Sequence, residues 1–210
     1  MTSKELIVIG ASDTFELAEA ALGPEGHSII GYLAPEPNNF SMYQRYPYLG
    51  NDDVISSGKY PDAGYVLALA DNARRREIFK AVIAAGNEAM TVVHPQAILY
   101  PSATLSRGTL MAPLVVISSL AEVGDGVYFN YASHVGHDVT IGDFCFLGPG
   151  SKLFGEVEVG SGVLLGANVV VFPQIKIGDN ARIAANTVVV RDVPPGVTLM
   201  SSQQTRTLRL

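Results

Sequence analysis

The sequence predicts a chain of two parts: a small α/β domain over residues 1–95 and a parallel β-helix of hexapeptide repeats over residues 96–198. From residue 99 to residue 189, an aliphatic or large apolar residue recurs at every sixth position. Glycine often follows that residue, and small or β-branched residues stand four positions after it. Before residue 95, short apolar runs alternate with helical patterns. The six-residue series is Leu99, Leu105, Met111, Ile117, Val123, Phe129, Val135, Ile141, Leu147, Leu153, Val159, Leu165, Val171, Ile177, Ile183 and Val189.

The fixed period of six is what identifies the β-helix. Strands alternate with a period of two and helices repeat at about 3.6 residues, so neither produces this pattern. A long repeat of six is typical of hexapeptide β-helices, in which three hexads form one triangular coil. Residues eighteen apart are therefore expected to lie above one another, separated by one strand spacing of about 4.8 Å. Residues 199–210 follow the last coil as a polar tail.

The first part of the chain alternates between strand and helix patterns. This alternation predicts a small Rossmann-like domain with a parallel sheet between layers of helices. Ser12 or Asp13 is suited to cap the first helix, Asp52 or Asp53 to start a short helix towards Ile55, and Asp71 to cap the next helix. In chain order we expect strands over 5–10, 27–33, 65–69 and 90–93, helices after 11–13 and over 71–85, and a turn over 46–50.

Composition and charge exclude several classes of protein. The 210 residues are 48% hydrophobic and 16% charged, which is a folded composition and not a disordered one. The formal net charge of -6, without a basic run, argues against nucleic acid or anionic membrane as a partner. The first ten residues form an apolar strand pattern and no run is long enough to cross a bilayer, so we expect a cytoplasmic protein. The single cysteine, Cys145, forbids an internal disulfide and stands at an inward position of the repeat.

His137 and Asp138 are the residues in the coils best suited to acid–base chemistry. His137 stands at an outward position of its hexad, and an imidazole exchanges its proton near neutral pH. The adjacent Asp138 carboxylate can orient the ring and stabilise its protonated form. A surface histidine beside an aspartate without any catalytic role remains an equally good interpretation of these two residues alone.

The chain resembles a known family in two features. A predicted α/β domain precedes hexad coils, and residues 136–143 of these coils are Gly-His-Asp-Val-Thr-Ile-Gly-Asp. The family is that of bacterial sugar acyltransferases, which includes sialic acid O-acetyltransferases and N-acetyltransferases of nucleotide-linked 4-amino-6-deoxy sugars. The resemblance covers essentially the whole chain. It implies left-handed coils, a homotrimer, acetyl-CoA as co-substrate and no metal. It also implies that His137 is the catalytic base and Asp138 its partner.

The resemblance and the eighteen-residue spacing together suggest where acetyl-CoA binds. Gly155 comes eighteen residues after His137, so its N–H is expected near the oxyanion that forms from the thioester carbonyl. Phe154-Gly155-Glu156 also interrupts the usual corner pattern, which predicts a deviating backbone there. By resemblance, Phe146 stands beside acetyl-CoA where the family often has histidine, and the pantetheine touches the backbone near Ala167 and Ala185.

Residues for the acceptor sugar are also suggested by the resemblance. Asn130 matches an asparagine near the acceptor, and Asn72 and Arg75 fall in a partly kept family pattern of the first domain. Ser12 and Asp13 occupy the turn that receives the nucleotide in the family. Here that turn, residues 10–15, reads Gly-Ala-Ser-Asp-Thr-Phe in place of a glycine-rich sequence, and Asp13 would repel a phosphate.

The sequence therefore favours an acyl-CoA-dependent acyltransferase that acts on an amine or hydroxyl of a sugar, with a nucleotide-linked amino-deoxy sugar as the expected acceptor. Two alternatives stay open: a non-catalytic β-helix trimer that acts as a binding or scaffold protein, and a sugar O-acetyltransferase with a non-nucleotide acceptor. A metal-dependent β-helix enzyme needs three clustered histidines, whereas the coils contain only His134 and His137.

Overall fold

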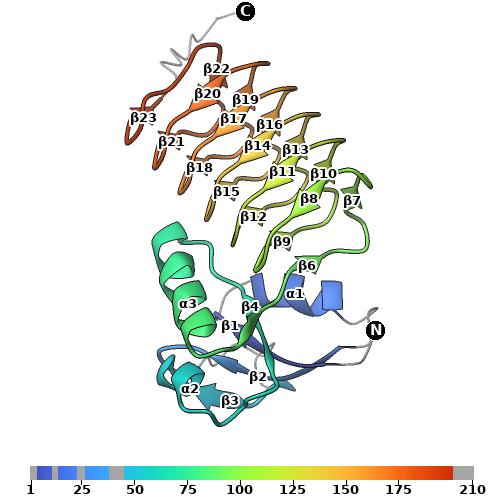
Figure 1. Cartoon of the computed structure of the whole chain (residues 1–210), viewed down its shortest axis with the longest axis vertical. Helices are drawn as coiled ribbons and strands as arrows, with labels where there is room; N and C mark the ends of the chain where they lie inside the picture. The colour runs from blue at the N-terminus through green and yellow to red at the C-terminus, as the bar shows by residue number, and fades with distance from the viewer. Residues whose placement is uncertain (1–3, 11–13, 23–26, 38–44, 201–210) are drawn as a thin grey trace, which may run out of the picture.

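A computed structural model describes residues 4–10, 14–22, 27–37 and 45–200 (Figure 1). The N-terminal part is a five-stranded parallel sheet in the order β3-β2-β1-β4-β5, with helices on both faces. The alternating apolar residues of β1 explain the layers. Leu6 and Val8 share one apolar cluster with Phe15 of α1, whereas Ile7 shares another with Ile78 of α3. The elements are β1 Glu5–Ile9, α1 Thr14–Leu22, β2 Ser28–Leu33, β3 Tyr48–Gly50, α2 Asp53–Ser56, β4 Gly64–Leu67, α3 Asn72–Ala84 and β5 Glu88–Ala89.

Two details of the predicted first domain are wrong. The turn expected over 46–50 contains the edge strand β3, which pairs with β2. The strand expected over 90–93 is divided: β5 ends at Ala89, and Val92–Val93 form β6, which pairs with β9 of the coils. The backbone N–H of Val92 donates to Thr109 O across 2.8 Å, so the chain leaves the sheet there and enters the prism.

The predicted coils are confirmed, and they form a prism with three parallel sheets (Figure 1). From β6 to β22, each strand pairs with the strand eighteen residues away, as Val116 does with His134 and His134 with Lys152. The last strand, β23, pairs with β21 at a separation of sixteen residues, as Thr198 does with Arg182. The first face consists of β6 Val92–Val93, β9 Leu110–Met111, β12 Tyr128–Phe129, β15 Phe146–Leu147, β18 Leu164–Leu165, β21 Arg182–Ile183 and β23 Thr198–Leu199. The second consists of β7 Ile98–Leu99, β10 Val116–Ile117, β13 His134–Val135, β16 Lys152–Leu153, β19 Val170–Val171 and β22 Val188–Val189. The third consists of β8 Thr104–Leu105, β11 Glu122–Val123, β14 Thr140–Ile141, β17 Glu158–Val159 and β20 Lys176–Ile177.

Three corners join the faces: one with alanine residues, one with His137, and one in contact with a helix. The alanine corner lies between the first and second faces, the histidine corner between the second and third, and the helix corner, which packs against α3, between the third and first. The alanine corner includes residues 130–133, 148–151, 166–169 and 184–187; the histidine corner includes 136–139, 154–157 and 172–175; the helix corner includes 106–109, 124–127, 142–145, 160–163 and 178–181.

The prediction of a deviating backbone at Phe154-Gly155-Glu156 is wrong. Glu156 has a φ of 62°, as Asp138 has 56° one coil earlier, and the N–H of Phe154 donates to Val171 O in the regular pattern. The left-handed region is therefore a property of this corner position and not of one residue. The corner keeps its shape although its first residue is phenylalanine and not glycine.

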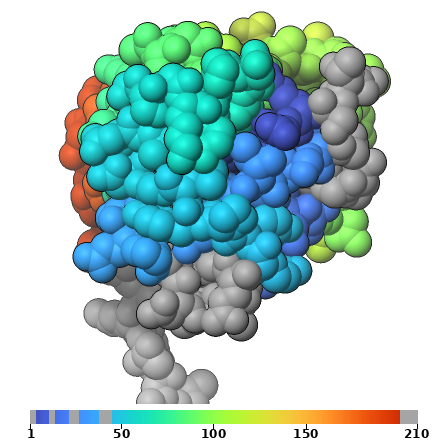
Figure 2. Space-filling model, turned by 90° about the horizontal axis from the view of Figure 1, so that it is seen from below, coloured from blue at the N-terminus to red at the C-terminus, as the bar shows by residue number. Residues whose placement is uncertain are grey.

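The α/β domain covers the N-terminal end of the prism, and in the view from below it lies in front of the coils, which are visible around its rim (Figure 2). Arg75 of α3 joins the two parts. Its side chain is 0% exposed and donates hydrogen bonds to Gly126 O at 2.6 Å and Cys145 O at 2.9 Å in the helix corner. Burial lowers the pKa of Arg75 to about 10, which leaves the guanidinium charged at neutral pH. Within the described residues, no helix has the length and apolar character to cross a membrane.

We expect Arg75→Ala to reduce the free energy of unfolding by about 3 kcal/mol or more, because it leaves several buried carbonyl oxygens without a donor. Lys80→Ala on the exposed side of α3 is the control and should change stability by less than about 0.5 kcal/mol. Denaturant unfolding measures both variants. Equal stability of the two would contradict the joining role of Arg75.

Candidate active site

His137 and Asp138 lie in the histidine corner, where Gly136 separates them from the end of β13. The Nδ1 atom of His137 lies 2.8 Å from Asp138 Oδ2, and the histidine side chain is 62% exposed. The left-handed backbone of Asp138 turns its carboxylate back toward the preceding residue. With Nδ1–H donating to the carboxylate, the lone pair lies on Nε2. The ring is thus oriented so that Nε2 can act as a base.

Gly155 lies against the ring of His137, as the eighteen-residue spacing predicts. A β-carbon on Gly155 would stand 2.5 Å from both Cε1 and Nε2 of His137. The backbone bond from Glu156 N to His137 O, 2.9 Å long, fixes this register. Only glycine leaves the room that the ring occupies, so the residue is required for space and not for its backbone angles.

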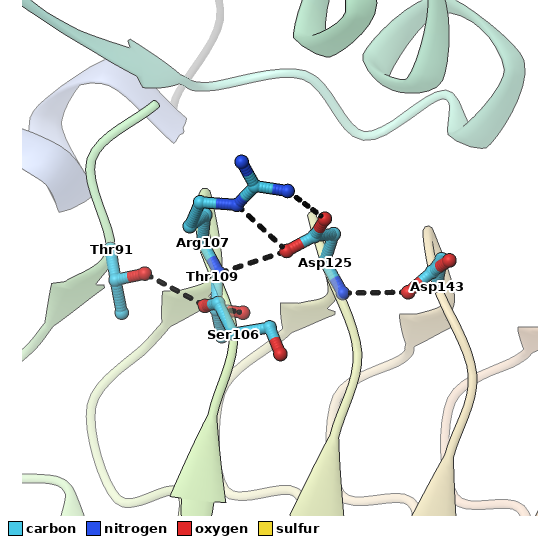
Figure 3. A network of polar contacts seen from close by, with 6 residues as sticks. All are labelled: Thr91, Ser106, Arg107, Thr109, Asp125 and Asp143. Atoms are coloured by element: carbon cyan, nitrogen blue, oxygen red, sulfur yellow. Dashed lines mark hydrogen bonds and ion pairs between the residues drawn. The ribbon is translucent and has the colours of Figure 1, made fainter. Parts of the chain in front are cut away.

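The N–H of Gly155 has no hydrogen-bond partner among the described residues. The same position in the helix corner shows what this N–H can bind. There, Asp125 N donates to Asp143 Oδ1 at 2.8 Å (Figure 3). In the same way, Ser161 N donates to Asp179 Oδ1 at 2.7 Å. In each case the acceptor belongs to the residue eighteen positions later. The residue eighteen positions after Gly155 is Pro173, which has no polar side chain, so this N–H remains open to an external oxygen.

The residues predicted to touch acetyl-CoA lie at another corner. Ala167 and Ala185 are in the alanine corner, and their N–H groups also lack partners among the described residues. Such unpaired amide donors fit the amide-containing pantetheine chain of CoA. Phe146 lies on the first face, half-buried, with its ring edge-to-face with Tyr128 at 5.2 Å. Within one chain, the structure does not bring these residues to His137.

The predicted acceptor residues are also separated from His137 within the chain. Asn130 lies in the alanine corner, where its Oδ1 accepts a hydrogen bond from Tyr131 N at 2.8 Å. Asn72 donates from Nδ2 to Gly162 O and Val163 O, each at 3.1 Å, and so joins α3 to the helix corner. Ser12 and Asp13 lie outside the described residues.

Arg75 has no free donor for a ligand. Besides Gly126 O and Cys145 O, its guanidinium donates to Leu69 O, Ala70 O and Asn72 Oδ1, which engages all five N–H groups. The geometry therefore favours a structural role for Arg75 over the predicted contact with substrate.

A cleft of about 600 Å³ opens between residues 88–91 and the helix corner, away from His137. Its charged groups are already paired: Arg107 binds Asp125, and the Asp143 carboxylate accepts from Asp125 N (Figure 3). The cleft therefore offers no free cation to a phosphate, and its chemistry is weaker than that of the histidine corner. Among the described residues, no group of three or more His, Cys, Asp or Glu side chains is placed to hold a metal ion.

The sequence indicated Phe154 only as a break in the corner pattern, and no site role was predicted for Phe154 or for Phe172, which both lie in the histidine corner. Their rings are exposed, with centroids 6.2 Å apart. The signal was present in the sequence, because large aromatic residues stand here at a corner position that is often glycine elsewhere. Pro173 was a second signal, since it leaves the Gly155 N–H without a side-chain acceptor.

Comparison with known families identifies the repeat. The family model described as "Bacterial transferase hexapeptide (six repeats)" matches residues 156–191, and "Hexapeptide repeat of succinyl-transferase" matches residues 138–173. A curated protein, GDP-perosamine N-acetyltransferase from Escherichia coli O157:H7, is 28% identical over 94 residues. That match spans 42% of this chain and 42% of the relative.

Solved structures match over nearly the whole chain. A mutant of perosamine N-acetyltransferase from Caulobacter crescentus, in complex with CoA and GDP-perosamine, has a TM-score of 0.88 at 26% identity, covering 96% of this chain and 95% of that one. The acetyltransferase domain of PglB from Neisseria gonorrhoeae, in complex with acetyl coenzyme A, also has a TM-score of 0.88 at 26% identity, covering 95% and 97%.

We expect Gly155→Ala to displace the His137 ring at little cost in stability, below about 1 kcal/mol, because the exposed ring can rotate away. Gly136→Ala is the matched comparison: its β-carbon would meet backbone atoms, Phe154 C at 2.8 Å and Gly155 N at 2.9 Å. That clash should cost about 1–3 kcal/mol. Denaturant unfolding compares the two, and nitrogen NMR of the His137 ring reports its bond to Asp138. A larger stability loss in Gly155→Ala than in Gly136→Ala would contradict this geometry.

Proposed function

We propose that this chain, which belongs to the hexapeptide-repeat superfamily that includes sugar N-acetyltransferases, transfers an acyl group from acyl-CoA to a sugar. The observation that carries the proposal is the pairing of His137, oriented by Asp138, with the open N–H of Gly155 one coil above. A base and an oxyanion donor on adjacent coils are the two groups that acyl transfer from a thioester needs. The structural matches to enzymes bound to CoA or acetyl-CoA support the same reaction.

In the proposed mechanism, His137 Nε2 accepts a proton from the acceptor amine or hydroxyl as its nitrogen or oxygen attacks the thioester carbonyl carbon. Gly155 N–H donates to the carbonyl oxygen as that oxygen gains negative charge. Asp138 stabilises the imidazolium that forms. The carbon–sulfur bond then breaks, and His137 returns the proton to the CoA thiolate. The products are the acylated sugar and free CoA, and no residue of the chain is acylated.

The site is complete only when two copies of the chain meet. The alanine corner, with Ala167, Ala185 and Asn130, is one prism face away from His137 in the same chain. In a cyclic homotrimer, the histidine corner of one copy can face the alanine corner of the next, so that the CoA groove and the base come from different copies. Phe146 would then lie near the thioester end of this groove.

The acceptor that this arrangement favours is a nucleotide-linked amino-deoxy sugar. The parallel order β3-β2-β1-β4-β5 supports a Rossmann-like domain, which binds nucleotides at the carboxyl ends of its strands. Ser12 and Asp13, which lie outside the described residues, come three and four positions after the last residue of β1 in the sequence. O-acylation of a sugar uses the same base and donor. The left-handed coils, the domain boundary near residue 95 and the cytoplasmic location stay predictions.

The proposal is tested by thiol release from acetyl-CoA, with nucleotide-linked amino sugars and free sugars offered as acceptors. We expect one acceptor class to give turnover, His137→Ala to lower kcat about 10²–10⁴-fold, and its CoA affinity to stay unchanged. Asp138→Asn should lower kcat less, because the base remains. The matched control is His134→Ala, which removes an exposed histidine from β13. Burial raises the pKa of Cys145 to about 12, so the protein's own thiol should add little signal.

Full turnover in His137→Ala would contradict the proposed base. Absence of thiol release with every acceptor, together with absence of CoA binding in calorimetry, would instead favour a binding or scaffold protein.

A further inference from the structure

An apolar strip begins beside the proposed oxyanion donor. It consists of Phe154, Phe172 and Val190, which follow the inward aliphatic residues of β16, β19 and β22. Their exposed fractions are 39%, 46% and 61%. At the helix corner, the position that follows the inward aliphatic residue carries small residues only, Ser106, Gly124, Gly142, Gly160 and Gly178.

The strip runs along the prism axis, away from the α/β domain. Its members are eighteen residues apart, so they lie above one another on successive coils, and the strip spans roughly 10 Å at about 4.8 Å per coil. The rings of Phe154 and Phe172 are 6.2 Å apart with an angle of 34° between their planes. Phe154 is the residue directly before Gly155, so the strip starts next to the N–H that would hold the thioester carbonyl.

The other side of the same corner is polar. Glu156 and Gln174 lie on the coils of Phe154 and Phe172, with Asp138 one coil earlier, and Gln174 Nε2 donates to Glu156 Oε2 at 3.0 Å. Gly155 lies between these polar side chains and the strip. A ligand held at the Gly155 N–H therefore meets hydrogen-bonding groups on one side and only apolar surface on the other.

We infer that the strip binds the alkyl chain of the transferred acyl group, so that acyl-CoA with a chain longer than acetyl is the preferred donor. This inference rests on the proposed function. Three groups meet at Gly155 in that reaction: the sugar, the pantetheine and the acyl chain. The sugar carries hydroxyl groups and the pantetheine carries amides, so both suit the polar side. The acyl chain alone has no hydrogen-bonding group beyond its carbonyl, and burying it against the strip is favourable.

Calorimetric titration of the full-length protein with acetyl-, butyryl- and hexanoyl-CoA tests the inference. Complete burial of a methylene group corresponds to about a fourfold gain in affinity, so partial contact with the strip should give roughly two- to fourfold per methylene. Phe154→Ala and Phe172→Ala should remove this dependence on chain length and leave acetyl-CoA affinity within about twofold. Phe154→Leu, which keeps an apolar side chain, should retain it.

Tyr100→Ala is the matched control, because Tyr100 holds the same corner position and is 44% exposed, but lies on the other side of His137 along the axis. It should keep the full chain-length dependence. Equal affinity of the wild-type protein for all three acyl-CoAs would overturn the inference, as would an unchanged dependence in Phe154→Ala and Phe172→Ala. Turnover of acetyl-CoA that is lost in His137→Ala supports the proposed function. If affinity for acyl-CoA is at the same time independent of chain length, only the inference about the strip fails. If no acyl-CoA binds, the proposed function fails with it.

Discussion

The parallel pairing of residues eighteen apart is the constraint on which the rest of this structure depends. His134 pairs with Lys152 and Val135 with Leu153, and this register alone places Gly155 over His137. A shift of one residue would move the inward aliphatic residues outward and would separate the base from the N–H beside it. The buried aliphatic interior therefore fixes the geometry of the site as well as the stability of the prism.

The same repeat gives corners with different chemistry. At the helix corner, backbone N–H groups donate to side chains of the next coil, as Asp125 N does to Asp143. Arg75 of the α/β domain donates to carbonyl oxygens of the same corner, so the corner binds that domain. At the histidine and alanine corners, glycine, proline and alanine leave N–H groups without partners among the described residues. In our account, the helix corner, whose N–H groups donate to side chains of the chain itself, is structural. The histidine and alanine corners, whose N–H groups lack such partners among the described residues, bind substrates.

The repeat made the prism, its register and the contact of His137 with Gly155 predictable, because a fixed period converts sequence distance into position. The role of Arg75 was not predictable in this way. It depends on how α3 docks on the coils, which no local pattern of α3 specifies. The exit of the chain from the sheet after Ala89 depends likewise on the pairing of Val92 with Leu110. The exposed Phe154 and Phe172 were visible in the sequence, but their closeness to the base required the register and the corner geometry together.

The measurement that tests the central claim most directly is a crystal structure of the protein with acetyl-CoA bound. Our account predicts the thioester carbonyl oxygen within about 3 Å of Gly155 N, with the acyl carbon facing His137 Nε2. It also predicts that the pantetheine runs along the alanine corner of a neighbouring copy. Acetyl-CoA bound in the cleft beside Arg107, with the histidine corner free of ligand, would contradict the account.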